Sequence, residues 1–229
     1  MHDLLIALQA FWEEYGVLLL EGIRDTLYMT LLSTFFGYII GLPMGIVLTL
    51  TDKEGISPNR IIYTTLDVII NITRSIPFLI LLILLVPLTK ALVGKSYGST
   101  ATIVPLTCAA APLIARMVES SLKEVNKGVI EAATSMGASK FRIIINVLLG
   151  EAKTSLVVGT TIVLGTVLGY SAMAGVVGGG GLGDIAIRYG YYRFETGITL
   201  ITVIFIVAIV QILQGLGMLV AKKSDHRRT

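Results

Sequence analysis

Long hydrophobic runs separated by short polar segments dominate the chain. Residues 26–50, 155–177 and 198–221 contain no Asp, Glu, Lys or Arg, and each run exceeds the roughly 20 residues that a helix needs to cross the hydrocarbon core of a bilayer. Residues 99–115 are also uncharged, but this run is shorter and contains Pro105 and Pro112. We predict membrane-spanning helices over all four runs, with a bent axis in the one that holds the prolines.

The region 61–88 is apolar but is interrupted by Asp67 and Arg74. We predict one span here with a hydrated cytoplasmic end; the alternative is two short segments, which gives six spans and places both termini on one side. Asp67 and Arg74 are seven residues apart and share a helix face, where each charge is costly inside a bilayer. Either they pair with groups of a partner subunit, or both lie in the hydrated headgroup zone.

Composition supports an all-α integral membrane protein. Hydrophobic residues make up 54% of the chain and charged residues 14%, whereas about a quarter of the residues of soluble domains are charged. Five spans put the termini on opposite sides, and an outside N-terminus leaves 13 of the 18 Lys and Arg residues on the inside. The positive-inside rule therefore predicts that the N-terminus is outside and the C-terminus is in the cytoplasm. Because this topology accounts for the net charge of +3, the charge implies nothing about nucleic acid, and we expect no nucleic acid partner.

The two ends of the chain differ in charge. Residues 1–25 carry five acidic residues and no basic n-region, so we expect no cleaved signal peptide. This segment is either an arm without fixed structure or an amphipathic helix over residues 4–20 on the outer face, with Phe11, Trp12 and Tyr15 at headgroup level. We expect residues 222–229 to form a basic cytoplasmic tail and residues 26–221 to form the membrane domain.

Cys108 is the single cysteine of the chain, so we expect it to be a small residue packed inside the fourth span.

A polar segment over residues 116–153 interrupts the apolar pattern. Apolar residues at roughly helical spacing predict short amphipathic helices on the cytoplasmic face. The pattern within this segment predicts one short helix, a turn and a second helix over residues 141–148. The first helix contains Glu131, Ala132 and Ala133, and the turn is at Gly137. The small alanines allow close approach of another protein and Glu131 offers a negative charge; the alternative is a polar loop whose helix packs on its own bundle.

Two glycine-containing segments resemble phosphate-binding loops only in part. The sequence Gly94-Lys95-Ser96 has Thr89 where a phosphate-binding loop needs glycine, and no βαβ pattern surrounds the glycine run at 178–183, so we expect no ATP hydrolysis by this chain. The glycines of that run instead suggest a gate or hinge near an outer mouth, or else a closely packed turn; they are Gly178, Gly179, Gly180, Gly181 and Gly183.

A solute path needs polar or adaptable side chains on otherwise apolar helices. Tyr170, Ser171 and Met173 fit this description near the outer end of their span, and the Met173 thioether suits a thioether solute. The alternative is helix packing, which is common for Met and Ser in membranes. The uncharged spans hold no carboxylate, which argues against a proton-coupled carrier.

The polar segment resembles the cytoplasmic signature of the permease subunits of ABC importers. The resemblance lies in Glu131-Ala132-Ala133, Gly137, Val147 and Leu149, with Gly150 where that family usually has proline. Further segments over nearly the whole chain resemble the methionine-uptake permease subfamily. These segments are Arg-Ser-Ile-Pro-Phe at 74–78, Val-Pro-Leu-Thr at 104–107, Ala-Pro at 111–112, Ile-Ala-Arg-Met-Val-Glu at 114–119, and residues 169–183, which begin with Gly-Tyr-Ser-Ala-Met.

This resemblance implies a type I-like ABC importer permease fold. It also implies a homodimer, two cytoplasmic ATP-binding subunits that carry ATP and Mg, an extracytoplasmic solute-binding protein, and methionine as the substrate. The 116–153 segment would be the coupling loop, and this chain itself would bind no metal or cofactor. The alternatives are an ion-coupled secondary amino-acid carrier, a permease for a different amino acid, or a membrane scaffold that transports nothing.

Overall fold

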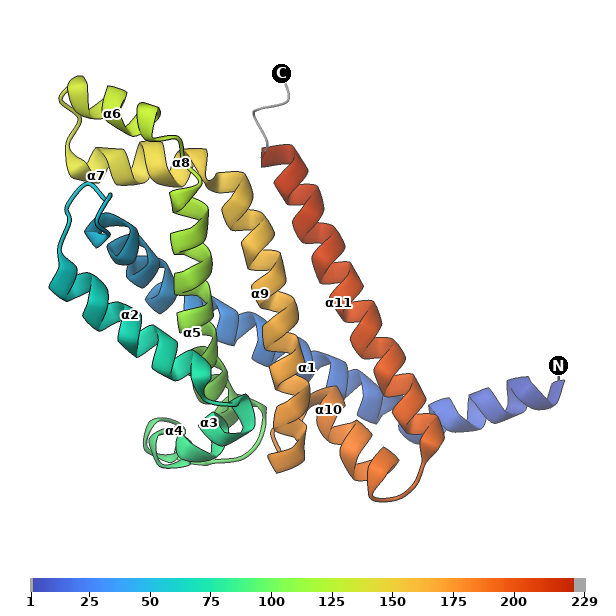
Figure 1. The fold of residues 1–229 in the computed structure, drawn as a ribbon. Helices are drawn as coiled ribbons and strands as arrows, with labels where there is room; N and C mark the ends of the chain where they lie inside the picture. The colour runs from blue at the N-terminus through green and yellow to red at the C-terminus, as the bar shows by residue number, and fades with distance from the viewer. Residues whose placement is uncertain (1, 225–229) are drawn as a thin grey trace.

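The computed structural model describes residues 2–224, and side chains from residue 11 onward. All regular structure in this part of the chain is helical (Figure 1), which confirms the all-α prediction there. The α-helices are α1 (His2–Thr51), α2 (Arg60–Ser75), α3 (Phe78–Leu84), α4 (Val86–Val93), α5 (Ser99–Lys123), α6 (Lys127–Ser135), α7 (Lys140–Arg142), α8 (Leu149–Glu151), α9 (Lys153–Ala174), α10 (Gly181–Ile185) and α11 (Thr196–Ser224). The segments η1 (Ile143–Leu148) and η3 (Ala186–Tyr191) are π-helical, and η2 (Gly175–Val177) is a 3₁₀ turn.

Four helical stretches are long and apolar enough to cross a membrane: Phe11–Thr51, Ser99–Lys123, Lys153–Tyr191 and Thr196–Ser224. Helices α2 and α3 together make a fifth candidate, bent by 103°. Helix α2 leads from the loop 52–59 toward α3, which lies at the end of the bundle where α5 begins (Figure 1). The described residues therefore hold four candidate spans, or five if the bent pair of α2 and α3 is counted as one span, and one span over 61–88 stays a prediction.

The bend between α2 and α3 follows from Pro77. Ile76 has extended backbone angles (φ −80°, ψ 123°), because a residue before proline avoids the helical region. Proline also lacks the N–H that would continue the helical hydrogen bonds. The chain therefore leaves the axis of α2 and starts a new helix at Phe78.

Helix α1 is longer than the predicted span 26–50. It runs from His2 to Thr51, so residue 25 lies inside one uninterrupted helix and not at a boundary between an N-terminal segment and the first span. Residues 2–25 are helical, which contradicts an arm without fixed structure, and their location on an outer face of the membrane stays a prediction. The division at residue 25 into a segment of its own stays a prediction without a structural break to support it.

Helices α1 and α5 pack unusually closely along a stripe of three glycines on α1. A Cβ atom at Gly37 would lie 2.9 Å from the Ala110 Cβ, one at Gly41 2.5 Å from a carbonyl oxygen of α5, and one at Gly45 2.6 Å from Val118. Small residues four apart allow membrane helices to approach in this way. The stripe fixes the part of α5 that carries the charged residues described below.

Helix α5 continues eight residues beyond the predicted end at residue 115 and passes through Pro105 and Pro112 without a break. The expected loop 116–153 is therefore shorter, because residues 116–123 are the last turns of α5 and Lys153 begins α9. The charges of Arg116, Glu119 and Lys123 did not end the helix because all three are paired. Helices α6 to α8 and the last turn of α11 lie at the same end of the bundle (Figure 1). Residues 225–229 of the predicted basic tail lie outside the described residues.

Candidate functional site

The predicted helix-turn-helix segment is present at the α6 end of the bundle. Asn126 caps α6 by accepting a hydrogen bond from the backbone N–H of Gly128 at 2.8 Å. Gly137 adopts a positive φ of 77°, the conformation that glycine adopts without steric cost, and the N–H of Ala138 returns to the carbonyl of Ala133 at 3.1 Å. The predicted turn at Gly137 is confirmed.

Helix α6 has one face on the bundle and one face open. Ala133 is only 7% exposed and belongs to the main apolar cluster, whereas Glu131 and Ala132 are exposed. The packing of this helix on its own bundle is therefore observed, and docking of another protein on its open face stays a prediction. Ala133 packs against its own chain, and Glu131 with Ala132 is accessible to another protein.

The second helix continues farther than the predicted residue 148. Elements α7, η1 and α8 follow without a gap from Lys140 to Glu151, and Ser139 caps the first of them by accepting from the N–H of Arg142 at 3.4 Å. Gly150 is part of α8, and an added Cβ there would meet nothing within 4 Å. Glycine in place of the family's proline therefore leaves the helix intact at this position.

Large apolar side chains are exposed on this segment. Met136 is 81% exposed, Phe141 73%, Ile145 45% and Val129 41%. These side chains lie outside the chain's own apolar clusters, and the same segment exposes Lys127, Glu131 and Lys140. Exposed apolar groups rimmed by charged residues are typical of protein contact sites.

A cavity of about 770 Å³ separates α6 from the end of α1 and the loop 52–59. Its polar lining comes from both sides, with Asp52, Lys53 and Glu54 on the loop side and Lys123, Lys127 and Glu131 on the other. Glu131 thus lines this cavity, as well as being accessible from outside.

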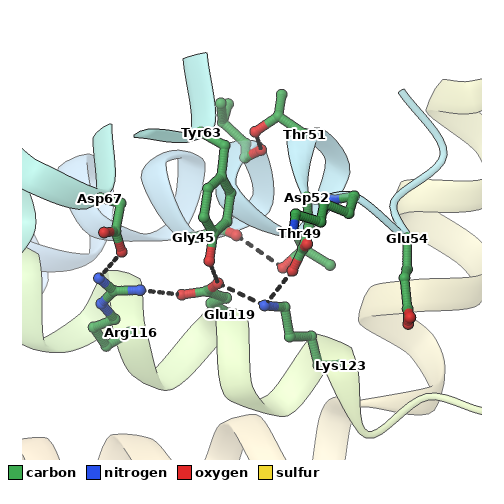
Figure 2. Close-up of polar contacts among 12 residues, drawn as sticks. Gly45, Thr49, Thr51, Asp52, Glu54, Tyr63, Asp67, Arg116, Glu119 and Lys123 are labelled. Atoms are coloured by element: carbon green, nitrogen blue, oxygen red, sulfur yellow. Dashed lines mark hydrogen bonds and ion pairs between the residues drawn. The ribbon is translucent and has the colours of Figure 1, made fainter. Parts of the chain in front are cut away.

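An ion-pair network lies beside this cavity and joins α2, α5 and the loop 52–59 (Figure 2). Glu119 of α5 is its centre and is 5% exposed. Its carboxylate accepts from Arg116 at 2.7 Å, from the Lys123 ammonium at 2.8 Å and from the Tyr63 hydroxyl at 3.2 Å. Arg116 also pairs with Asp67, and Lys123 pairs with Asp52 at 2.5 Å.

The network satisfies charges that would be costly if buried alone. Each cation contacts two carboxylates, so the loss of one contact leaves neither cation without a partner. Outside the spans, the hydrogen bond from the Lys123 ammonium holds the pKa of the Asp52 carboxyl below its usual value. Asp52 is therefore ionised wherever the protein is folded near neutral pH.

Sequence reasoning missed this network. Asp67 was expected to pair with a partner subunit or to lie in the headgroup zone, but it pairs with Arg116 of its own chain. Arg74 lies in the last turn of α2, at the end next to α3, about two turns of helix from Asp67, and its location in the headgroup zone stays a prediction. A signal was present, because Arg116, Glu119 and Lys123 are spaced by three and four residues and share one helix face.

The three predicted path residues do not face one site. The Tyr170 ring stacks on Phe78 of α3 with centroids 4.7 Å apart and planes at 4°. Ser171 is buried and donates to the carbonyl of Leu168 at 2.7 Å, whereas the Met173 side chain is 46% exposed. Met173 is exposed and Tyr170 is half-buried, so their place on a solute path stays a prediction, whereas the Ser171 hydroxyl is already used inside α9.

The glycine run is a tightly packed junction between α9 and α10. The Gly178 carbonyl accepts from the N–H of Gly98, and a Cβ at Gly183 would lie 2.2 Å from the Ala172 carbonyl oxygen. Gly180 and Gly181 have φ values of 82° and 78°. This packing agrees with the alternative of a closely packed turn, and a gate or hinge role stays a prediction. In the described part of the chain, no group of three or more His, Cys, Asp or Glu side chains is placed to hold a metal.

Comparison with known proteins gives consistent results. The family model described as "Binding-protein-dependent transport system inner membrane component" matches residues 27–226. The chain is 47% identical to the probable D-methionine transport system permease protein MetI of Vibrio cholerae, over 92% of this chain and 93% of that protein. It is 51% identical to the D-methionine transport system permease protein MetI of Escherichia coli, over 69% of this chain and 73% of that protein.

Solved structures show the same fold. A chain of the MetNI methionine ABC transporter in inward facing conformations superposes with a TM-score of 0.92 at 45% identity, covering 93% of this chain and 99% of that one. A chain of an amino acid ABC transporter crystallised with histidines superposes with a TM-score of 0.76 at 20% identity, covering 92% and 95%. The second similarity concerns the fold alone.

Proposed function

The chain belongs to the family of binding-protein-dependent transport system inner membrane components, and from this membership we propose that it is the membrane-spanning subunit of an ATP-driven importer of methionine. It is a multi-pass protein of the cell membrane and a permease subunit of an ABC importer, and ATP hydrolysis takes place on a separate subunit. The single observation that carries the substrate is the high identity to D-methionine permeases over nearly the full chain.

The exposed face of α6 is the docking site for the ATPase in this proposal. Glu131 and Ala132 are accessible there, and the neighbouring Met136 and Phe141 are among the most exposed apolar side chains. A short helix with small residues and an apolar rim suits a groove on a partner protein. Ala133 and the turn at Gly137 hold the helix against its own bundle, so a push on α6 reaches the spans.

The orientation follows from the same assignment. If α6 docks on a cytoplasmic ATPase, the loop 52–59 and the last turn of α11 at that end of the bundle are cytoplasmic too (Figure 1). The N-terminus is then outside and the C-terminus inside, as the distribution of Lys and Arg favours. Arg74 leaves the inside group, but the large excess of inside basic residues persists without it.

The complete importer contains two copies of this chain, two ATP-binding subunits with ATP and Mg, and an extracytoplasmic solute-binding protein. Five spans are few to enclose a solute path, so a path along the two-fold axis of a homodimer is expected. Tyr170 and Met173 contribute side chains to that path, and the glycine run positions its outer end. Docking of the ATPases drives opening to alternate sides of the membrane.

The test is uptake of labelled methionine by proteoliposomes that contain the complete importer. Wild type is compared with Glu131→Lys and with the control Glu124→Lys, which reverses an exposed charge at the end of α5. ATP-dependent accumulation that is lost in Glu131→Lys and kept in Glu124→Lys is the expected result. Accumulation without ATP would instead identify an ion-coupled carrier, uptake of only another amino acid would overturn the substrate, and no uptake at all would favour a scaffold.

A further inference from the structure

We propose that the loop 52–59, between α1 and α2, is a second mechanical connection between the ATPase-docking helices and the membrane spans, held by Lys123, Lys127 and Lys140. The proposal rests on the proposed function, because it takes α6 to be the docking helix. It adds residues outside the signature segment to the coupling apparatus, and the three lysines act as positioning residues.

Each of the three lysines lies at a helix junction and reaches the loop. Lys123 is the last residue of α5 and pairs with Asp52 at 2.5 Å. Lys127 is the first residue of α6 and pairs with Glu54. Lys140 is the first residue of α7 and donates to the hydroxyl of Ser57 at 2.6 Å. Successive positions along the loop are thus joined to successive elements of the docking segment.

The loop itself is held firmly by backbone hydrogen bonds. The N–H of Ser57 donates to the carbonyl of Leu50 at 3.0 Å and that of Asn59 to the carbonyl of Thr51 at 2.9 Å. A Cβ at Gly55 would lie 2.4 Å from the Leu50 carbonyl oxygen, so the loop lies directly on the last turn of α1. A loop bonded in this way transmits a displacement, whereas a loosely held loop would absorb it.

The connection continues from the loop into the spans. Asn59 caps α2 by accepting from the N–H groups of Ile61 and Ile62 at 3.1 and 3.2 Å. Helix α2 leads through the 103° bend to α3, where Phe78 stacks on Tyr170 of α9. A shift of α6 therefore reaches the proposed solute path through the loop and α2, in addition to the direct route along α5.

The pair between Lys127 and Glu54 is the best place to test this connection. Both side chains are well exposed, at 66% and 74%, so exchanging their charges disturbs no core packing. The pair between Lys123 and Asp52 is less suitable, because Lys123 also contacts the buried Glu119. Reversing one charge alone places two like charges side by side, which opposes the contact.

The experiment measures methionine transported per ATP hydrolysed by the complete importer in proteoliposomes. Glu54→Lys and Lys127→Glu are each expected to lower this ratio by about threefold, in the range of an exposed ion pair, with ATP hydrolysis retained. The double variant Glu54→Lys/Lys127→Glu restores the pair in reverse and is expected to recover the wild-type ratio. Glu124→Lys is the control, because it makes the same charge change next to the docking segment but contributes to none of the three contacts.

Failure of this inference is separate from failure of the proposed function. If wild type shows no ATP-dependent methionine uptake, the proposed function is wrong and this proposal falls with it. If wild type transports but both single variants keep its ratio, or the double variant stays as low as the single ones, the loop is not a coupling element. Size-exclusion chromatography of each complex shows whether assembly is intact, and Glu54→Gln supplies a milder variant if a charge reversal prevents it.

Discussion

Replacing Arg116 by methionine removes the guanidinium at the centre of the α2–α5 contact and keeps most of the aliphatic volume. The substitution deletes the ion pair with Asp67, the 2.7 Å bond to Glu119 and the 2.9 Å bond to Asn71. Removing one partner of a buried pair costs about 3–5 kcal/mol. The side chains of Arg116 and Asp67 are 21% and 29% exposed and Glu119 keeps Lys123, so the lower end, ~3 kcal/mol, applies.

That loss predicts a fall of about 6–12 °C in the apparent unfolding midpoint of the purified permease in detergent, since a chain of this size loses roughly 2–4 °C per kcal/mol. The measurement is the fraction of protein that remains monodisperse by size-exclusion chromatography after heating. Arg24→Met is the matched control, because Arg24 also pairs with an aspartate but its side chain is 73% exposed, and such a pair contributes about 1 kcal/mol at most. If both variants melt together, the network contributes no more than a surface pair and the reasoning is wrong.

Three further predictions follow from the contacts around the site. Gly183→Ala should destabilise the fold strongly, because its Cβ would lie 2.2 Å from a carbonyl oxygen of α9, whereas Gly169→Ala, with nothing within 4 Å of the new Cβ, should be tolerated; thermal melting of the two variants checks this. The pKa of Asp52 is lowered in the folded state, so its ionised carboxylate stabilises the fold above the unfolded pKa, and this contribution is lost as the pH falls through the folded pKa. Asp52→Asn should therefore lose less thermal stability than wild type between about pH 5 and pH 3, which thermal melting at each pH measures. Tyr170→Phe keeps the aromatic stack and should retain uptake, whereas Tyr170→Ala should lose most of it; labelled uptake by proteoliposomes distinguishes them.

The fold was largely predictable because the hydrophobic runs determine it directly. Residues 155–177 and 198–221 lie within helical stretches long enough to cross the membrane, and the helix-turn-helix around Gly137 followed from short-range signals. Boundaries were less predictable. Helix α1 passes through residue 25 because charges in a helix that extends beyond the bilayer need not end it.

The contacts between distant segments could not be predicted from local pattern. Tyr63 and Glu119 are 56 residues apart and Lys140 and Ser57 are 83 apart, so neither contact has a signature in sequence spacing. The stripe of Gly37, Gly41 and Gly45 was visible as a repeat of four, but its partner helix was not. Only the packing of α1 on α5 shows that these glycines fix the position of α5, and therefore the position of Glu119 relative to α2.

Helix ends are misplaced when they are predicted only from where an uncharged run stops, because charged residues near the end of a run can continue the helix. Arg116, Glu119 and Lys123 were assigned to the coupling loop 116–153 because the uncharged run ends at residue 115. The structure places them on one face of α5, where Asp67 and Asp52 approach from two other elements. A carboxylate shared between two cations removes the reason for a helix to end. The charges at this end of the bundle therefore join the spans to one another, and the same lysine that completes the network, Lys123, begins the series of contacts to the loop 52–59.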